Sequence, residues 1–549
     1  MAHGGMRHTL VSRRTFVQGS AAVGVLAALS GMGGVLSGCS SSSAASPSAS
    51  SGEKPESLTI YVGSEPESGF DPLTGWGYNG SYILFQSRLL KFDTNLDLQP
   101  DLATDWSVSP DGLTYTYTLR EGVKFSDGSA FSAEDVVFSF LTARDNGAST
   151  LDLTKLQDAK ALDEQTVEFT LSEPYSSFAS LTGKLGIVPQ AGYSDEGYRS
   201  APVGTGPFKL DQWDAGQQII ISPNEHYYGT ISPFKQITLL FLEGETALSN
   251  AQSGTMDVVM VQPEYAKSTV AGMTLETFPT IDTRGFNLPT AQETVREGKT
   301  IGNNVTCDKA IRKALAIGVD RQAIVDNALN GVGTATTALI TQVPWSNVAC
   351  SFKDGRIDEA QGLLDEAGWV VGSDGIRVKD GQKAEFSITG RTDDMQRYNV
   401  AVAFAQEAEK LGIKIDATSA LWSDCKANSE SIPTCWGTGD YDPSGDLCGY
   451  YKTGASTNHS QYSSEIVDGH IHDALDTTDA AASLESWKNV QWDGSAGPES
   501  EEGDLPNIWL VTIDHTYFVR DGLDLGDQPV HPHGHGWPVV CNLNEWTWK

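Results

Sequence analysis

The sequence predicts an α/β protein with more than one domain. Its 549 residues are 39% hydrophobic, which is enough to build about three or four packing units at roughly 150 residues each. The first half contains short segments that alternate apolar and polar residues, which is typical of antiparallel strands. Between residues 384 and 417 a strand, a helix and a strand follow one another. This order predicts a parallel βαβ unit with a right-handed crossover.

Strands in the first half are predicted where residues alternate, at residues 58–62, 105–108, 114–119 and 166–171. Ser109-Pro110-Asp111-Gly112 has the composition of a turn, so the second and third of these strands should form a hairpin. Ser132 precedes two acids and an apolar run, and we expect its side chain to cap a helix over residues 133–141.

Helices in the second half are predicted at residues 311–318, 321–331, 357–367 and 394–411, and strands at residues 384–389, 413–417 and 508–513. Asp320 should cap the second of these helices. Residues 494–503 are rich in Gly, Ser and Glu, which predicts a loop.

The charge balance excludes one class of partner. The chain has 37 Lys and Arg against 71 Asp and Glu, a formal net charge of −34. A nucleic-acid-binding protein needs a basic face to displace phosphate counterions, so nucleic acid is not an expected partner.

The N-terminal segment has the features of an export signal. Residues 1–38 contain three Arg and no acid, followed by an apolar run, and are predicted to be a signal peptide. Arg13-Arg14 lies in a segment that resembles a twin-arginine export motif. Leu36-Ser-Gly-Cys39 resembles a lipobox, so we expect Cys39 to be diacylated, which gives stable anchoring to a membrane. Residues 39–57 are mostly small and polar and predict a disordered tether.

Six cysteines follow Cys39, and an even number outside the cytoplasm favours disulfides. They are Cys307, Cys350, Cys425, Cys435, Cys448 and Cys541. No two have the CxxC spacing of a zinc ribbon, and the sequence leaves their pairing open.

From residue 58 to about residue 479 the chain resembles the extracytoplasmic solute-binding proteins of the peptide and nickel class (family 5) that serve ABC importers. The resemblance is carried by four segments, Leu119-Arg-Glu-Gly-Val-Lys-Phe125, Gly204-Thr-Gly-Pro-Phe-Lys-Leu210, Ile311-Arg-Lys-Ala-Leu315 and Leu363-Leu-Asp-Glu-Ala-Gly-Trp369. It implies a two-lobed periplasmic-binding-protein-like fold with an extra subdomain in the first lobe and two interlobe crossovers.

The same resemblance implies a lipid-anchored binding protein, not an enzyme, on the outer face of the bacterial cell membrane. Lobe I should comprise residues 58–290 and 495–549, and lobe II residues 291–494. The expected partners are a short peptide or similar zwitterionic solute and the membrane permease of an ABC importer. We expect a monomer that requires no cofactor.

The resemblance also points to ligand-binding residues. Cys435-Trp-Gly-Thr-Gly-Asp440-Tyr-Asp-Pro443 is similar to the segment whose Asp binds the amino group of a dipeptide in relatives, which makes Asp440 the candidate residue. Arg391 stands where relatives bind the peptide carboxylate. Because an unpaired buried charge is costly, an acid and a base at opposite ends of a pocket would select a zwitterion. The neighbouring candidates are Trp436, Tyr441 and His459.

Two other functions stay open. The first is binding of nickel, another transition metal or a metal chelate, although Ser444 stands where nickel-binding relatives have His after a similar Tyr-Asp-Pro segment. The second is a metal-dependent hydrolase, for which the sequence shows no Gly-x-Ser-x-Gly, His-Glu-x-x-His or Walker motif.

The C-terminal tail carries a candidate metal site. His531, His533 and His535 occupy alternate positions, with Pro and Gly between them, and His515 is the expected fourth ligand. Neutral imidazoles are good ligands for nickel, copper or zinc. The alternative is a tight structural loop in which the histidines form hydrogen bonds.

Overall fold

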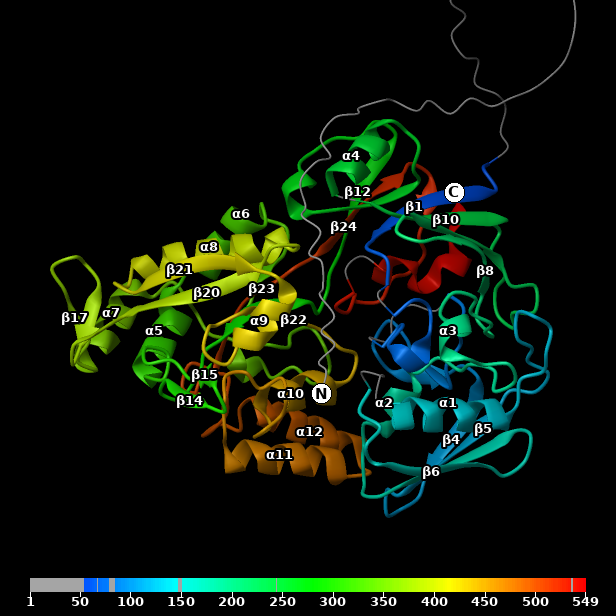
Figure 1. Ribbon diagram of the computed structural model, residues 1–549, viewed down its shortest axis with the longest axis horizontal. Coiled ribbons are helices and arrows are strands. Elements are labelled where there is room, and N and C mark those ends of the chain that lie inside the picture. The colour runs from blue at the N-terminus through cyan, green and yellow to red at the C-terminus, as the bar shows by residue number, and fades with distance from the viewer. Residues whose placement is uncertain (1–53, 67, 79–83, 147–150, 243, 535–536) are drawn as a thin grey trace, which may run out of the picture. The chain divides into compact units, whose positions relative to one another are not determined.

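The structure is a computed structural model (Figure 1) that describes residues 54–66, 68–78, 84–146, 151–242, 244–534 and 537–549. The predicted signal peptide, the predicted tether up to residue 53, Cys39 and His535 lie outside the described residues. No helix in the described part of the chain is long and apolar enough to cross a membrane.

The largest sheet has seven strands in the order β12-β24-β11-β1-β10-β9-β8. Their bounds are β1 (Ser57–Gly63), β8 (Phe208–Asp214), β9 (Gln218–Pro223), β10 (Gln236–Phe241), β11 (Val258–Val261), β12 (Met273–Phe278) and β24 (His515–Arg520). The central strand β1 pairs in parallel with β10 and β11, and the other pairs are antiparallel. Helix α4 (Gly244–Gln252) contacts β11, and the 3-10 segment η4 (Trp537–Glu545) packs into the same hydrophobic core.

A second, antiparallel sheet of four strands has the order β4-β5-β7-β6. It consists of β4 (Ala103–Val108), β5 (Thr114–Leu119), β6 (Leu156–Ala161) and β7 (Thr166–Leu171). Helix α1 (Ala133–Asn146) lies between β5 and β6 in the chain, and α2 (Phe178–Thr182) and α3 (Asp195–Tyr198) follow β7. Strands β4 and β5 form the predicted hairpin, with Tyr115 opposite Val108. The inward residues Tyr117, Phe140 and Phe169 share one core, which supports the alternating pattern of the strands.

The second half contains the α/β region that the sequence predicts. Strands β20 (Glu385–Arg391) and β21 (Lys414–Ala420) pair in parallel, and α8 (Met395–Glu409) joins them and packs on both (Figure 1). A separate four-stranded sheet has the order β16-β23-β13-β22, from β13 (Thr283–Asn287), β16 (Thr334–Ala335), β22 (Cys435–Thr438) and β23 (Asn507–Thr512). Helices α5 (Lys309–Gly318), α6 (Arg321–Ala328) and α7 (Ile357–Glu366) complete this core.

Four further helices follow β21. They are α9 (Trp422–Asn428), α10 (Pro443–Tyr451), α11 (Glu465–Asp476) and α12 (Ala480–Gln491). The Ser176 amide donates to the carbonyl of Leu475 at 2.8 Å, so α11 contacts the segment that leads into α2. The short elements are β2 (Leu90–Phe92), β3 (Leu98–Pro100), β14 (Thr294–Arg296), β15 (Lys299–Ile301), β17 (Val370–Val371), β18 (Arg377–Lys379), β19 (Gln382–Lys383), β25 (Leu523–Asp524), β26 (Thr547–Trp548), η1 (Pro72–Thr74), η2 (Pro263–Tyr265) and η3 (Val348–Cys350).

The chain passes twice between the seven-stranded sheet and the sheet of β13 and β23. Residues 279–282 connect β12 to β13, and residues 513–514 connect β23 to β24. The two connections lie side by side, because the Ile513 amide donates to the Asp282 carbonyl at 3.0 Å. These are the two crossovers expected from the sequence, whereas the exact lobe boundaries stay a prediction.

Two local predictions need correction. The cap before α1 is made by the Asp135 carboxylate, which accepts from the Ser132 amide at 2.9 Å and from its hydroxyl at 3.2 Å. The acid three residues into the helix therefore reaches back to Ser132, as in half of a capping box. Helix α6 is capped by Asp320 as expected, but ends at Ala328 instead of continuing to Gly331.

The predicted disulfides are not formed. All six cysteines within the described residues are free thiols, and Cys350, Cys425 and Cys435 are buried. The Cys425 thiol instead donates to the carbonyl of Gly390 at 3.5 Å. An even cysteine count was therefore a poor guide, because these side chains serve as small apolar residues of separate elements.

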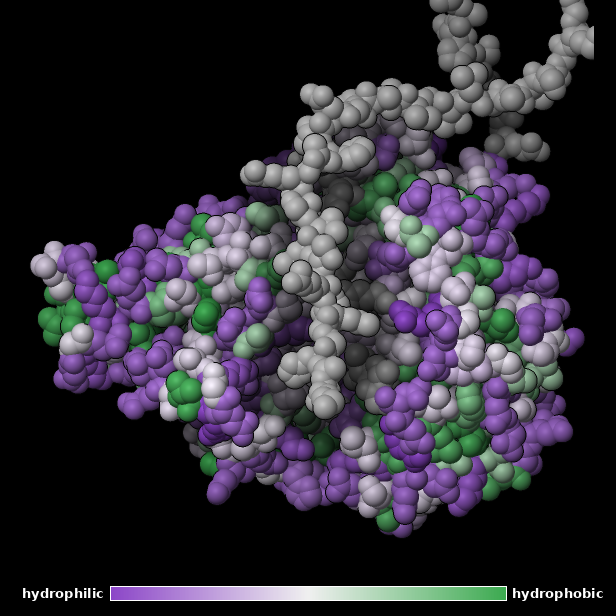
Figure 2. All heavy atoms as spheres, viewed as in Figure 1, coloured by the Kyte–Doolittle hydropathy of each residue, from purple (hydrophilic) through white to green (hydrophobic). Residues whose placement is uncertain are grey.

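The visible surface of the described residues is mostly hydrophilic. Figure 2 shows hydrophilic residues over most of the visible described face, with hydrophobic residues scattered among them. Single exposed apolar residues such as Val348 and Val295 are ordinary for a folded protein.

Candidate functional site

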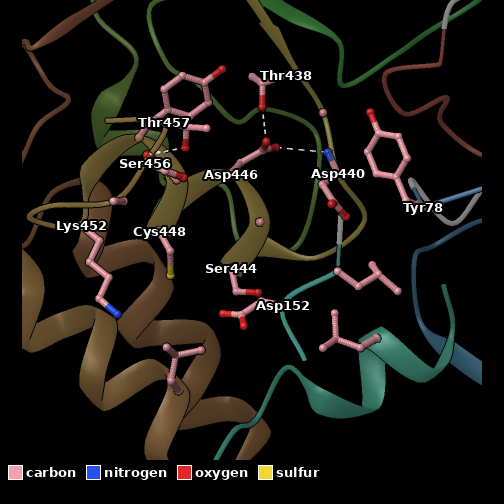
Figure 3. A pocket seen from close by; sticks show the side chains of 18 of the residues that line it. Tyr78, Asp152, Thr438, Asp440, Ser444, Asp446, Cys448, Lys452, Ser456 and Thr457 are labelled. Carbon is pink, nitrogen blue, oxygen red and sulfur yellow. Dashed lines mark hydrogen bonds between the residues drawn. The ribbon is translucent and has the colours of Figure 1, made fainter. Parts of the chain in front are cut away.

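The main candidate site is a cavity of about 670 Å³ beside β22 and α10 (Figure 3). One wall comes from residues 151–184, and the other from residues 436–457 and His533. The volume lies within the range of roughly 300–1,000 Å³ that ligand pockets occupy. Segments distant in the sequence thus meet at the predicted Trp436–Asp440 motif.

The motif that follows β22 forms a tight turn into α10. Asp442 caps the helix by accepting from the Ser444 amide at 2.9 Å, and Pro443 occupies the first helical position, where its missing N–H costs nothing. The Asp440 carboxylate accepts from the Asp442 amide at 2.9 Å. Gly439 has a φ of +153°, and a side chain there would meet the carbonyl of Ile281. The turn therefore holds Asp440 in place at the pocket.

Asp440 forms a buried ion pair inside the protein. Its carboxylate accepts a hydrogen bond from the Lys184 ammonium, and the Lys184 side chain is only 2% exposed. Burial raises the pKa of Asp440, and the lysine ammonium opposes that rise. The negative charge expected to bind a ligand amino group is thus already matched by a cation of the protein.

A second carboxyl group, Asp446, lies in the same pocket on the first turns of α10. It accepts from the Thr438 hydroxyl and, at 3.1 Å, from the Asp440 amide (Figure 3). Burial and the charge of Asp440 raise the pKa of Asp446 to about 7. Among the described residues, no ion pair reaches this group.

An aromatic stack extends from the pocket wall. Trp436 stacks on His459 with ring centroids 4.5 Å apart and contacts Trp422 edge-on at 5.0 Å. The Arg391 guanidinium lies 4.8 Å from the centre of the Trp422 ring. Burial lowers the pKa of His459 to about 4, so this ring is neutral at physiological pH.

The predicted ligand-binding residues are only partly brought together. Asp440 and Trp436 line the cavity, whereas Arg391, Tyr441 and His459 are not among its lining residues. Arg391 ends β20 and donates to Asp393 through two nitrogens, at 2.8 and 2.6 Å.

Tyr441 turns away from the pocket. Its hydroxyl donates to the carbonyl of Val530 at 2.6 Å, so the ring is buried against the C-terminal tail.

Sequence reasoning missed Lys184 and Asp446. Lys184 lies 256 residues before Asp440 in a segment without any motif, so nothing in the sequence indicated the pair. Asp446 could have been found, because it follows the Asp442-Pro443 helix start within one turn.

His531 and His533, the described histidines of the tail, have different neighbours. His531 and His515 lie with their Nδ1 atoms 3.1 Å apart, whereas His533 directs Nδ1 to the Asp282 carboxylate at 2.9 Å. His535 lies outside the described residues. Within the described residues, no group of three or more His, Cys, Asp or Glu is arranged to hold a metal ion.

Backbone contacts fix the tail beside the crossing segment. The Ile281 amide donates to the His531 carbonyl at 2.9 Å, and the His533 amide donates to the Gly439 carbonyl at 2.9 Å. Hydrogen bonds therefore hold the described tail, as the structural alternative expects, and metal binding stays a prediction.

The sequence model described as "Bacterial extracellular solute-binding proteins, family 5 Middle" matches residues 97–458. The chain belongs to this family. Family 5 proteins are extracytoplasmic binding proteins that deliver peptides or small ligands to ABC permeases and are not enzymes. The hydrolase alternative is therefore set aside.

Individual family 5 proteins support the assignment. "Protein XP55" of Streptomyces lividans is 32% identical over 495 residues, which cover 86% of each chain. A crystal structure of NikA from Brucella suis in complex with Fe(III)-EDTA aligns with a TM-score of 0.76 and 22% identity, covering 90% of this chain and 100% of the other. The structure of the oligopeptide-binding protein AppA from Bacillus subtilis, in complex with a nonapeptide, aligns with a TM-score of 0.70 and 21% identity, covering 90% of this chain and 99% of the other. The two-lobed α/β fold is thereby confirmed.

Proposed function

We propose that this family 5 protein is anchored by lipid and captures a short peptide or a similar zwitterionic solute for an ABC importer. The observation that carries the proposal is the charge pattern of the cavity. Besides the Lys184–Asp440 pair, the lining includes the acids Asp152 and Asp446 and the bases Lys155 and Lys452. A solute with both charges can find opposite charges on this lining, whereas an apolar solute would exclude water from these charged groups without adding a partner.

The aromatic and hydroxyl residues of the lining support the same class of ligand. Tyr78, Tyr450 and Trp436 offer flat apolar surfaces to the cavity, and Ser456 and Thr457 add hydroxyl groups to its lining. Pockets that bind polar organic solutes combine such surfaces with a few polar groups that fix orientation.

We expect protein purified from its own host to release a peptide or another amino-acid-like molecule on denaturation, detected by mass spectrometry. Elemental analysis of the same sample tests the alternative of a metal or metal chelate, which the Fe(III)-EDTA complex of NikA keeps in view. Stoichiometric metal, or an organic ligand without an amine and a carboxylate, would contradict the proposal.

Lipid anchoring is supported by Leu36-Ser-Gly-Cys39 alone, which lies outside the described residues. We expect the wild-type chain to fractionate with membranes, because two acyl chains give stable anchoring. The Cys39→Ala variant should be found in the soluble fraction, or in the medium, after export. Cys307→Ala is the matched control and should stay with the membranes. An exported Cys39→Ala protein that remains membrane-bound would disprove this mode of anchoring.

A further inference from the structure

The cavity contains two neighbouring carboxyl groups, Asp440 and Asp446, which are both partly buried, but the buried cation contacts only one of them. Lys184 donates to Asp440. Asp446 accepts only from neutral donors, the Thr438 hydroxyl and the Asp440 amide. The described residues include no Lys, Arg or His within ion-pair distance of Asp446.

We infer that Asp446, and not Asp440, is the residue that binds the cationic group of the ligand, an ammonium or a guanidinium. This inference rests on the proposed function and adds a specificity-determining residue to the same site.

The hydrogen bonds of Asp446 leave room for a ligand. A carboxylate offers about four acceptor positions on its two oxygens, and the Thr438 hydroxyl and the Asp440 amide use two of them. In Figure 3 the Asp446 side chain points from α10 toward Thr438 and Asp440, within the lining of the cavity. The two protein donors orient the carboxyl group, and a ligand N–H can approach its remaining positions.

A ligand ammonium would bind Asp440 less readily. It would have to compete with the Lys184 ammonium, whose side chain is 2% exposed and would lose its counter-charge in a buried place. An unpaired buried charge is strongly unfavourable. Asp446 has no such competitor, so a cation that arrives there neutralises a charge and leaves the Lys184–Asp440 pair intact.

The groups around Asp446 make binding depend on pH. Burial and Asp440 raise the pKa of Asp446 to about 7, and Lys184 opposes the rise. Three other titratable groups of the lining are neutral at pH 7, because burial raises the pKa of Tyr450 and, to about 12, that of Cys448, and lowers the pKa of His533. The charged members of the lining are Asp152, Lys155, Lys452 and the Lys184–Asp440 pair. At pH 7 the free carboxyl group is therefore about half protonated, and a bound cation expels that proton.

The test uses calorimetry on the mature wild-type protein with tripeptides Ala-Xaa-Ala that vary the central residue, each with a free and an N-acetylated amino terminus. Free-amine peptides should bind, and acetylation should weaken binding roughly 30-fold or more. The peptide ammonium has an ordinary pKa near 8. Affinity corrected for the fraction of peptide that still carries this charge should rise from pH 6 to pH 8, as Asp446 ionises. Titrations at pH 7 in buffers of different ionisation enthalpy should show release of about half a proton, and this measurement needs no variant.

Asp446→Asn should weaken binding of the free-amine peptides roughly 30-fold or more and remove the rise between pH 6 and pH 8. Asp473→Asn, which removes an exposed acid of α11 away from the cavity, should match the wild type. Equal affinity and the same pH dependence in Asp446→Asn would overturn the inference and leave the proposed function standing. Failure of every peptide to bind the wild type at 1 mM, which is roughly the weakest affinity of interest, would overturn both.

Discussion

Replacing Lys184 with Met should lower the free energy of unfolding by about 3 kcal/mol, measured by urea denaturation at pH 7. The substitution keeps the length of the side chain but removes the one cation that contacts Asp440 among the residues that the structure describes. Removing one partner of a buried pair typically costs about 3–5 kcal/mol, and the lower end applies because the Asp440 side chain is 18% exposed. Asp442 increases the effect, since its charge also disfavours ionised Asp440.

The double variant Lys184→Met with Asp440→Asn separates loss of charge from loss of packing. Its asparagine can still accept from the Asp442 amide, and no buried charge remains unpaired, so most of the lost stability should return. Lys235→Met is the matched control, because Lys235 pairs with Glu56 at the surface, with the side chains 72% and 63% exposed. It should change stability by no more than about 1 kcal/mol. A loss below about 1 kcal/mol in Lys184→Met would contradict the importance of the pair.

Asp282→Asn should destabilise the protein by about 3–5 kcal/mol at pH 7 in the same assay. Asp282 is buried in the crossing segment between β12 and β13 and lies 2.6 Å from Arg284 and 2.9 Å from Nδ1 of His533. Without the charge of Asp282, the buried Arg284 guanidinium has no anionic partner among the described residues. Burial and the nearby charge of Arg284 lower the pKa of Arg397. Arg397 keeps its ion pair with Asp394 at 2.9 Å, so the neutral variant leaves Arg284 as an uncompensated buried cation beside it.

The pH dependence gives a second readout for Asp282. Arg284 and His533 hold the pKa of Asp282 well below its usual range. The ionised Asp282 carboxylate thus contributes fully to the free energy of unfolding above the unfolded-state pKa near 4. This contribution is lost as the pH falls through the lower folded-state pKa. The difference between wild type and variant should stay constant from pH 7 to about pH 5 and decrease below pH 4. Asp393→Asn, which breaks the more exposed pair with Arg391, should cost at most about 1 kcal/mol.

Local patterns in the sequence were sufficient for most of the regular elements. Strand β1, the hairpin of β4 and β5, and the β20-α8-β21 unit all follow from periodicity and turn composition, because these signals depend on neighbours within a few residues. The cap of α1 was assigned to the wrong side chain. In a capping box the side chain of either residue, Ser132 or Asp135, can accept from the backbone amide of the other.

The candidate site depended on contacts that no local pattern contains. The motif around Asp440 could be located, but its partner Lys184 comes from a segment 256 residues earlier. Alternation also placed the tail histidines on one side of an extended chain, whereas His531 faces His515 and His533 faces Asp282. The directions of His531 and His533 are decided by the residues that they contact, and these residues belong to other parts of the chain.

The order of strands in the largest sheet has a consequence for how the protein is made. Strand β24 inserts between β12 and β11, although it ends only 29 residues before the C-terminus. Until the ribosome has released this segment, β11 and β12 each present an unpaired edge, and such edges can pair with other chains. The sheet can close only after β24 has been synthesised, and β24 begins 237 residues after the end of β12. Chains truncated before His515 should therefore aggregate instead of accumulating as a smaller folded protein.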